Sequence, residues 1–140
     1  MGLRPYYLGD TSALARAVRP QVAARLDPLL EGGLVARCTP TDLEAGFSSP
    51  SPASHRAMRD ARAGWPFVAM DQGVLDRAVA VQDVLAERSQ QRGARIADLL
   101  IAAAAEAAEL VVLHYDHDFD LIAEITAQPT EWIVPAGTVP

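Results

Sequence analysis

The sequence predicts an α/β fold built on a central, mainly parallel β-sheet of about five strands. Short apolar runs rich in branched side chains, such as Leu110–Leu113, have the length and composition of strands that are buried on both faces. Several of these runs lead through an acidic turn into a segment whose apolar residues recur at helical spacing. Strand, turn and helix in repeated order are typical of a parallel sheet covered by helices.

The first forty residues are predicted to form a strand, two helices and a second strand. Tyr6–Leu8 is a short aromatic and apolar run, and helical spacing follows it as far as Val18. A helix is expected over residues 21–30, since proline favours a helix start and glycines close many helices. Pro28 should shorten or bend this helix. Residues 34–39 have the composition of the second strand.

The middle of the chain is predicted to be helical around a proline-rich break. Thr41, followed three residues later by Glu44, forms a capping-box pattern at the start of one helix. Residues 47–53 interrupt regular structure, and a helix resumes over residues 54–62. The arginines of that helix lie one turn apart and are interpreted as a solvated face: Arg56, Arg59 and Arg62.

The remaining elements complete the predicted sheet and its cover. Residues 66–70 are predicted to form another strand, and apolar spacing predicts the longest helix over residues 71–88. A further helix begins at residues 95–98 and continues through the alanine-rich run 102–108, whose small side chains permit close packing against the sheet. The last predicted strand covers residues 131–134.

Length and composition bound the organisation of the chain. With 140 residues, half of them hydrophobic, we expect a single domain over residues 1–140 without a separate linker. The start lacks the apolar core of a signal peptide, and no apolar run is long enough to span a bilayer, so we expect no membrane association. Cys38 is the sole cysteine, which favours a buried thiol and a cytoplasmic location.

The charged residues exclude some functions and leave others open. The chain has no lysine, which excludes phosphate-loop nucleotide hydrolases. The net charge of −6 argues against broad, nonspecific binding of nucleic acid. It does not exclude an RNA substrate, because clustered site carboxylates inflate the charge and a bound divalent metal ion would offset it.

Three aspartates follow the strand Leu110–Leu113 and precede the next helix. Asp116, Asp118 and Asp120 lie where open α/β sheets place their binding sites. Helix capping is an alternative, but one cap needs one aspartate, and three within five residues repel one another. An EF-hand loop is rejected because its sixth and twelfth positions would be Leu121 and Ala127. A metal-binding role is therefore favoured for Asp116, with Asp118 as a second candidate.

Three other acids occupy comparable positions. Asp10 follows the first strand, and the two hydroxyl residues after it are expected to make a carboxylate redundant for capping, which favours a site role. Glu44 follows the second strand, although it is equally well explained as the partner in the capping box. Asp98 lies in the first turn of an apolar helix, where it is either a dipole partner or the lining of a polar cleft.

Four carboxylates at the mouths of separate elements stay ionised together only if a cation joins them. Ligands that are all oxygen favour Mg²⁺ or Mn²⁺. A zinc site is disfavoured because the chain has neither a cysteine cluster nor two histidines at His-x-x-x-His spacing.

Three motifs and one glutamate together resemble PIN-domain ribonucleases, and most closely the VapC toxins of bacterial toxin–antitoxin pairs. They are Gly-Asp-Thr-Ser-Ala-Leu at residues 9–14, Glu44, Ile-Ala-Asp-Leu-Leu-Ile-Ala-Ala at 96–103, and Leu-His-Tyr-Asp-His-Asp-Phe-Asp-Leu-Ile-Ala at 113–123. The resemblance implies a three-layer α/β/α fold. It also implies a catalytic acidic quartet of Asp10, Glu44, Asp98 and Asp116, with Asp10, Asp98, Asp116 and Asp118 as metal ligands.

The same resemblance implies an activity and partners. The expected reaction is Mg²⁺- or Mn²⁺-dependent endonucleolytic hydrolysis of RNA, with tRNA or another structured RNA as the target and inhibition of translation as the effect. A VapB-type antitoxin would block the acidic site, and the toxin would be a homodimer. The alternative is a catalytically weak PIN-like module that binds proteins. A haloacid-dehalogenase-type phosphohydrolase is disfavoured because it needs an Asp-x-Asp motif and a lysine. The second aspartate of that motif would be at position 12, where the chain has Ser12, and the chain has no lysine.

Overall fold

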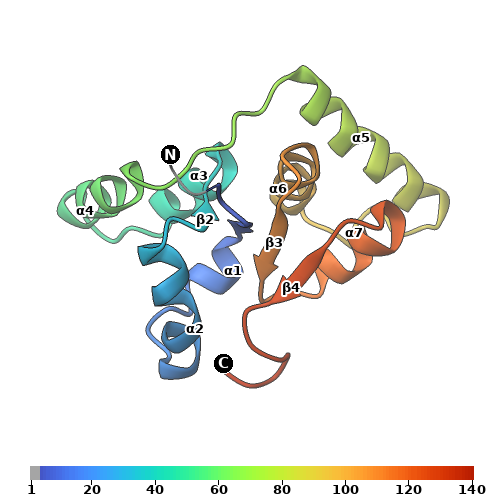
Figure 1. Cartoon of the computed structure of the whole chain (residues 1–140). Helices are drawn as coiled ribbons and strands as arrows, with labels where there is room; N and C mark the ends of the chain where they lie inside the picture. Colours follow the sequence, from blue (N-terminus) through green and yellow to red (C-terminus); the bar gives the residue numbers. More distant parts are fainter. Residues whose placement is uncertain (1–3) are drawn as a thin grey trace.

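A parallel four-stranded sheet with helices on both faces forms the centre of the protein, in a computed structural model that describes residues 4–140 (Figure 1). The strand order is β2-β1-β3-β4, and every neighbouring pair is parallel. The expected three-layer α/β/α arrangement is therefore confirmed. The strands are β1 (Tyr7–Gly9), β2 (Val35–Ala36), β3 (Val111–His114) and β4 (Thr130–Trp132).

Alternate side chains of the strands pack into two hydrophobic clusters, one on each face of the sheet. Leu8 and Val112, which are partners in the β1–β3 register, belong to the cluster under α5, α6 and α7. Val35 and Leu113 belong to the cluster under α1 and α2. Figure 1 shows these two groups of helices on opposite sides of the strands. The helices are α1 (Thr11–Leu14), α2 (Pro20–Glu31), α5 (Gln72–Glu87), α6 (Ile96–Ala107) and α7 (Asp118–Thr126).

Helix α6 lies close to the sheet because its inward residues are small. Ala102–Ala105 are all buried, and Gln128 donates a hydrogen bond to the carbonyl oxygen of Ala102 at 2.9 Å. This packing brings the first turn of α6, which carries Asp98, to the carboxyl ends of β1 and β3. Among residues 4–140, no helix combines the length and the apolar composition needed to cross a membrane.

The predicted fifth strand, residues 66–70, is reduced to a single bridge. Arg37 donates its backbone N–H to Pro66 and accepts one from Val68, both at 2.9 Å, and nothing else in the segment pairs as a strand. The reason is the shortness of β2: the next helix begins at Thr39, so no extended partner continues the ladder. The prediction of about five strands is therefore wrong by one.

Two predicted helix boundaries also differ from the structure. Helix α1 ends at Leu14 instead of reaching Val18, whose side chain is 86% exposed, so its apolar spacing did not reflect a buried face. Helix α2 runs through Pro28 to Glu31 and is not shortened. Pro28 lies on the exposed side of that helix, where water can satisfy the carbonyl that lacks a helical donor.

Helices α3 (Thr39–Phe47) and α4 (Pro52–Ala63) are joined by a buried arginine. Arg62 is 7% exposed, and its guanidinium binds Asp42 Oδ1 at 2.9 Å and Thr41 Oγ1 at 3.2 Å. The same carboxylate pairs with Arg37, the residue that directly follows β2. The interpretation of Arg62 as part of a solvated face is therefore wrong, because the residue fastens α4 to α3.

One glycine is required by close packing at the end of β1. A Cβ atom on Gly9 would lie 2.8 Å from Val35 Cγ1 and 3.4 Å from Leu14 Cδ1, whereas a Cβ on Gly64 would meet nothing within 4 Å. Both substitutions by alanine restrict the unfolded chain alike. We therefore expect Gly9→Ala to lower the free energy of unfolding by about 1–3 kcal/mol relative to Gly64→Ala. Urea denaturation of the two variants measures this difference, and equal values would contradict the packing argument.

Candidate active site

Four of the predicted acids line one cavity at the carboxyl ends of β1 and β3. The cavity has a volume of about 230 Å³. Asp118 is not among its lining residues, and two arginines, Arg16 and Arg95, stand beside the acids. In a parallel sheet all strands end at the same edge, so residues far apart in sequence meet there. The acids that the structure brings together in this cavity are Asp10, Glu44, Asp98 and Asp116.

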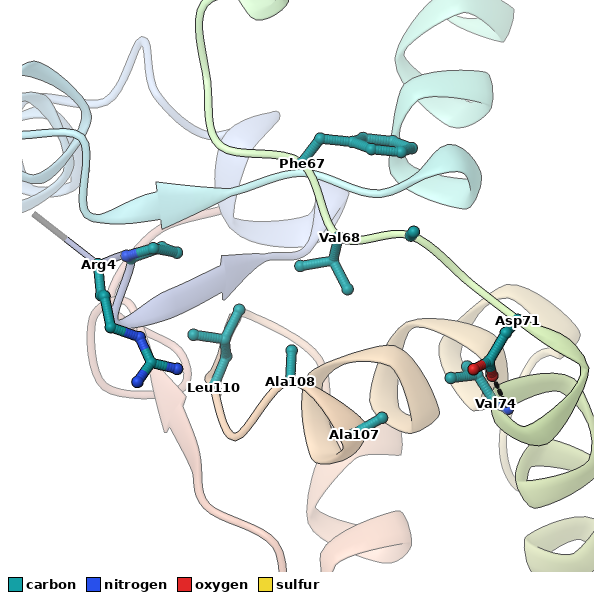
Figure 2. Close-up of a pocket in the computed structure, with 10 residues that line it drawn as sticks. Arg4, Phe67, Val68, Asp71, Val74, Ala107, Ala108 and Leu110 are labelled. Atoms are coloured by element: carbon teal, nitrogen blue, oxygen red, sulfur yellow. Dashed lines mark hydrogen bonds between the residues drawn. The ribbon is translucent and has the colours of Figure 1, made fainter. Parts of the chain in front are cut away.

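A second hollow, of about 450 Å³, lies where β1 and β3 begin (Figure 2). It is lined by Arg4, Leu110 and the segment that carries Phe67 and Val68. Its one lining carboxylate, Asp71, accepts the backbone N–H of Val74 at 3.0 Å and caps α5. This hollow therefore lacks the acid cluster and is not the candidate site.

Asp10 is buried and uses one of its two carboxylate oxygens as a helix cap. Oδ2 accepts hydrogen bonds from the backbone N–H of Ser12 at 2.9 Å and from its hydroxyl at 2.5 Å. The argument that the hydroxyl residues make Asp10 redundant for capping is therefore wrong. Oδ1 is buried and has no hydrogen-bond partner within residues 4–140. Burial raises the pKa of Asp10 to about 6.

The two hydroxyl residues after Asp10 hold other parts of the site. Thr11 donates to Glu44 Oε1 at 3.0 Å, and the Ser12 hydroxyl accepts the backbone N–H of Tyr115 at 2.8 Å. Ser12 thus ties the exit of β1 to the exit of β3. Sequence reasoning missed both roles. The available signal was the placement of two hydroxyls directly after an acid at the end of a strand.

Glu44 is free to face the cavity because α3 begins earlier than predicted. Cys38 occupies the N-cap position, and its backbone N–H donates to Thr41 Oγ1 at 3.1 Å. Thr41 is therefore the third residue of the helix, and the predicted capping box between Thr41 and Glu44 is wrong. Glu44 lies in the next turn, where its partner is Thr11.

The tightest acid group consists of Asp98, Asp116 and Asp118. One carboxylate oxygen from each lies within 4.8 Å of those of the other two. Asp98 is 4% exposed, and its Oδ2 has no hydrogen-bond partner within residues 4–140. Burial, a hydrogen bond to Asp118 and the neighbouring negative charges raise the pKa of Asp98 to about 8. Oxygen ligands at this spacing, with buried atoms left unpaired, fit a hard divalent cation.

Asp116 is held by two local hydrogen bonds. Its Oδ1 accepts the backbone N–H of Asp118 at 2.9 Å, and its own N–H donates to His114 Nδ1 at 3.2 Å. His114 is fully buried, and burial lowers its pKa to about 4, so the ring is neutral and Nδ1 can accept. His114 is a site residue that the sequence did not reveal, because a histidine inside an apolar run carries no sign of its partner.

Asp120 belongs neither to the lining of the acid cavity nor to the group of Asp98, Asp116 and Asp118. Its Oδ1 accepts the indole N–H of Trp132 at 3.3 Å, and Oδ2 lies 3.3 Å from His117 Nδ1. Asp120 therefore contacts an aromatic cluster beside the cavity, which includes His117 and Trp132.

Comparison with known proteins places this geometry in context. The sequence pattern of the PIN domain matches residues 7–125. The chain is 49% identical over 133 residues to ribonuclease VapC51 of Mycobacterium tuberculosis, covering 95% of this chain and 96% of the relative. It is 46% identical over 136 residues to ribonuclease VapC21 of the same organism, covering 94% and 96%.

Two solved structures share the fold. VapBC-1 from nontypeable Haemophilus influenzae superposes with a TM-score of 0.69 at 18% identity, covering 91% of this chain and 98% of that chain. VapBC-5 from Mycobacterium tuberculosis, a member of the VapBC family of toxin–antitoxin systems, gives 0.63 at 21% identity with the same coverage. At these identities the likeness shows the fold alone.

The raised pKa of Asp98 predicts how stability depends on pH without divalent ions. Between about pH 6.5 and 8 the folded chain still binds the Asp98 proton that the unfolded chain has lost, so the free energy of unfolding should fall as pH rises. Below that window, Asp10 acts in the same direction, but the lowered pKa of His114 acts in the opposite one. The measurement is urea denaturation in EDTA across the upper window.

Asp98→Asn is the control, because asparagine cannot titrate and should flatten the dependence. Added Mn²⁺ should raise stability most at the upper end of the window, where the proton competes least. A wild-type protein with no pH dependence, or one unaffected by saturating Mn²⁺, would contradict the description of this cluster.

Proposed function

The chain belongs to the PIN-domain family, and on that premise we propose that it is a VapC-type toxin that hydrolyses RNA as a metal-dependent endoribonuclease. The observation that carries the proposal is the meeting of Asp10, Glu44, Asp98 and Asp116 in one cavity. The curated relatives bear the name ribonuclease and match nearly the whole chain, which supports RNA as the substrate.

We propose Mg²⁺ or Mn²⁺ as the cofactor, held by Asp98, Asp116 and Asp118 with Asp10 at the same cavity. The close spacing of three carboxylates and the unpaired buried oxygens of Asp98 and Asp10 support this assignment. When bound, such an ion stabilises the negative charge that develops on a phosphodiester during hydrolysis and makes water more acidic.

The residues of the chain prepare the site for that reaction. Ser12 fixes one oxygen of Asp10 and leaves the other free, while Thr11 fixes Oε1 of Glu44. Asp10 and Glu44 can therefore orient a water molecule without reorganising, which is the condition for effective general-base catalysis. Neutral His114 fixes the backbone of Asp116 and adds no charge to the cluster.

The proposed biological effect is inhibition of translation through cleavage of tRNA or another structured RNA. An antitoxin of the VapB type is the proposed control, and the VapBC structures that share this fold support such a partner. Helix α3 offers a docking surface: Leu43 and Phe47 are 67% and 94% exposed, and Glu44 stands beside them in the cavity. An apolar helix on this surface could place an arginine among the carboxylates, where a bidentate pair forms.

We further propose that the active form is a homodimer joined along α5 and α6. A groove of about 290 Å³ between these helices is lined almost entirely by apolar residues. Val79 and Ile96 in this groove are 58% and 74% exposed. A self-complementary face of this kind suits a two-fold pair. Ile96 lies two residues before Asp98, so the pairing would set the two acid cavities near one interface.

The ribonuclease proposal predicts which acids are essential. Asp10→Asn and Asp116→Asn should each reduce Mn²⁺-dependent cleavage of total RNA by about 100-fold or more. Asp120→Asn is the matched control, because Asp120 does not line the acid cavity and the asparagine carbonyl oxygen can still accept the indole N–H of Trp132, so its rate should stay close to that of the wild type. Circular dichroism and thermal melts establish that the variants are folded, as expected when repulsion in the cluster is relieved.

A folded Asp116→Asn variant that cuts RNA at the wild-type rate would overturn the assignment of that residue. A wild-type protein that binds Mn²⁺ but cuts no RNA would favour the alternative, a catalytically weak PIN-like module for protein binding.

The control proposal predicts competition between the antitoxin and the metal. In a complex with the product of the adjacent open reading frame, inhibition should weaken as Mn²⁺ is raised, because both occupy the carboxylates. Asp98→Asn should lower the affinity of the partner by about tenfold or more, since a buried charge pair is lost. RNA-cleavage and binding titrations of the complex measure both effects. An affinity that ignores the metal and the substitution would place the contact elsewhere.

A further inference from the structure

A second groove continues from the acid cavity along the end of the sheet. It has a volume of about 440 Å³ and shares Arg16, Arg95, Tyr115 and Asp116 with the cavity, so the two form one continuous depression. Beyond the shared residues its wall is made by aromatic side chains and by the segment after β4. These additional residues are His117, Trp132, Ala136, Gly137 and Val139.

The aromatic wall is ordered and partly open to solvent. Trp132 meets Tyr115 edge to face at 5.4 Å and His117 at 4.8 Å between ring centroids. Its indole N–H donates to Asp120 at 3.3 Å, which fixes the plane of the ring. The His117 side chain is 80% exposed. Flat rings held in this way and left accessible can stack against another planar group.

The groove also carries cationic groups that no acid neutralises within residues 4–140. Arg16 binds the main-chain oxygens of Pro140 at 2.9 Å and Ser12 at 2.6 Å, and its guanidinium lies 4.6 Å from the centre of the Tyr115 ring. Neither Arg16 nor Arg95 forms an ion pair with an aspartate or glutamate in that part of the chain. The positive charges of these two arginines can therefore attract a phosphate beside a cavity whose carboxylates repel one.

Planar stacking groups and guanidinium groups that form no ion pair with an aspartate or glutamate within residues 4–140 together match the chemistry of a nucleotide. We propose that this groove holds an unpaired nucleotide next to the scissile bond of RNA, with its base against His117 and Trp132 and its phosphate at Arg16 and Arg95. The proposal rests on the ribonuclease function proposed above. A base must leave its duplex to stack on a side chain, so cleavage falls in a loop or another single-stranded segment.

The test measures binding separately from cleavage. Asp10 lies outside the groove, so the Asp10→Asn variant provides a protein that binds RNA without cutting it, and the groove substitutions are made in this variant. The probe is a fluorescein-labelled oligouridylate, compared with a duplex of the same length, and fluorescence anisotropy in Mn²⁺ gives Kd. In this background, His117→Ala and Arg95→Gln should each weaken binding of the single strand by about tenfold.

Matched controls remove the same groups elsewhere. His55→Ala changes an exposed histidine on α4, and Arg4→Gln changes an exposed arginine at the opposite end of β1. Both should leave Kd within about twofold of the background, as expected for sites without stacking or phosphate contacts. The duplex should bind more weakly than the single strand.

Two further readings separate stacking from charge. Arg95→Gln should reduce the slope of log Kd against log salt by about 0.7, the change expected when one phosphate contact to a single strand is lost. His117→Ala should leave that slope unchanged, and His117→Tyr should restore affinity because it restores a ring.

The outcomes distinguish this proposal from the one on which it rests. Normal cleavage by the wild type together with unaltered binding by the His117 and Arg95 variants would overturn the groove and leave the ribonuclease intact. Weakened binding by those variants in a protein that cuts no RNA would support the groove and overturn the ribonuclease. Equal binding of duplex and single strand, or loss of affinity for the antitoxin in place of RNA, would also overturn the proposal.

Discussion

Carboxylates that are buried together repel one another and lose their hydration, and the site depends on how the fold manages that cost. Three of the four acids have one oxygen or their backbone fixed by an uncharged donor or acceptor: Ser12 for Asp10, Thr11 for Glu44 and His114 for Asp116. None of these partners carries a charge. These contacts therefore position the cluster without adding positive charge, and burial raises the pKa of Asp10 to about 6 and that of Asp98 to about 8.

Close packing of the backbone makes this arrangement possible. Gly9 lets Val35 approach β1, and the alanines of α6 let that helix approach the sheet, so that Asp98 reaches the cavity. The partly buried pairing of Asp42 with Arg37 and Arg62 holds α3 between β2 and α4, which helps to determine where Glu44 lies. The contacts that pack the core are consequently the same contacts that bring the carboxylates of the site together.

The sequence predicts the parts of this structure that local signals encode. Strand runs, acidic turns and helical spacing predicted the parallel sheet, its covering helices and the acids that meet in the cavity, whereas the three-layer arrangement was implied by the resemblance to PIN-domain ribonucleases. The strand predicted at residues 66–70 does not form because its length depends on pairing with β2. That strand lies some thirty residues earlier and is soon followed by α3. The bridge from Ser12 to Tyr115 spans 103 residues, and the buried contact of Arg62 spans 20, so neither leaves a local pattern. Asp10 both caps α1 and lines the acid cavity, although capping and a site role had been treated as alternatives.

The position of the segment after β4 determines the order in which the two parts of the depression become available during synthesis. Tyr115 donates its hydroxyl to the carbonyl oxygen of Val139 at 2.7 Å and accepts the N–H of the same residue at 3.1 Å. The residues that line the acid cavity end at Asp116, and the acid group beside it ends at Asp118, whereas the neighbouring groove is also lined by residues between 132 and 139. On the ribosome, which delivers the chain from its amino end, the carboxylates are all synthesised before the wall that continues from their cavity. A nascent chain therefore acquires the complete depression only after Val139 has been added, later than all of the carboxylates of the cavity.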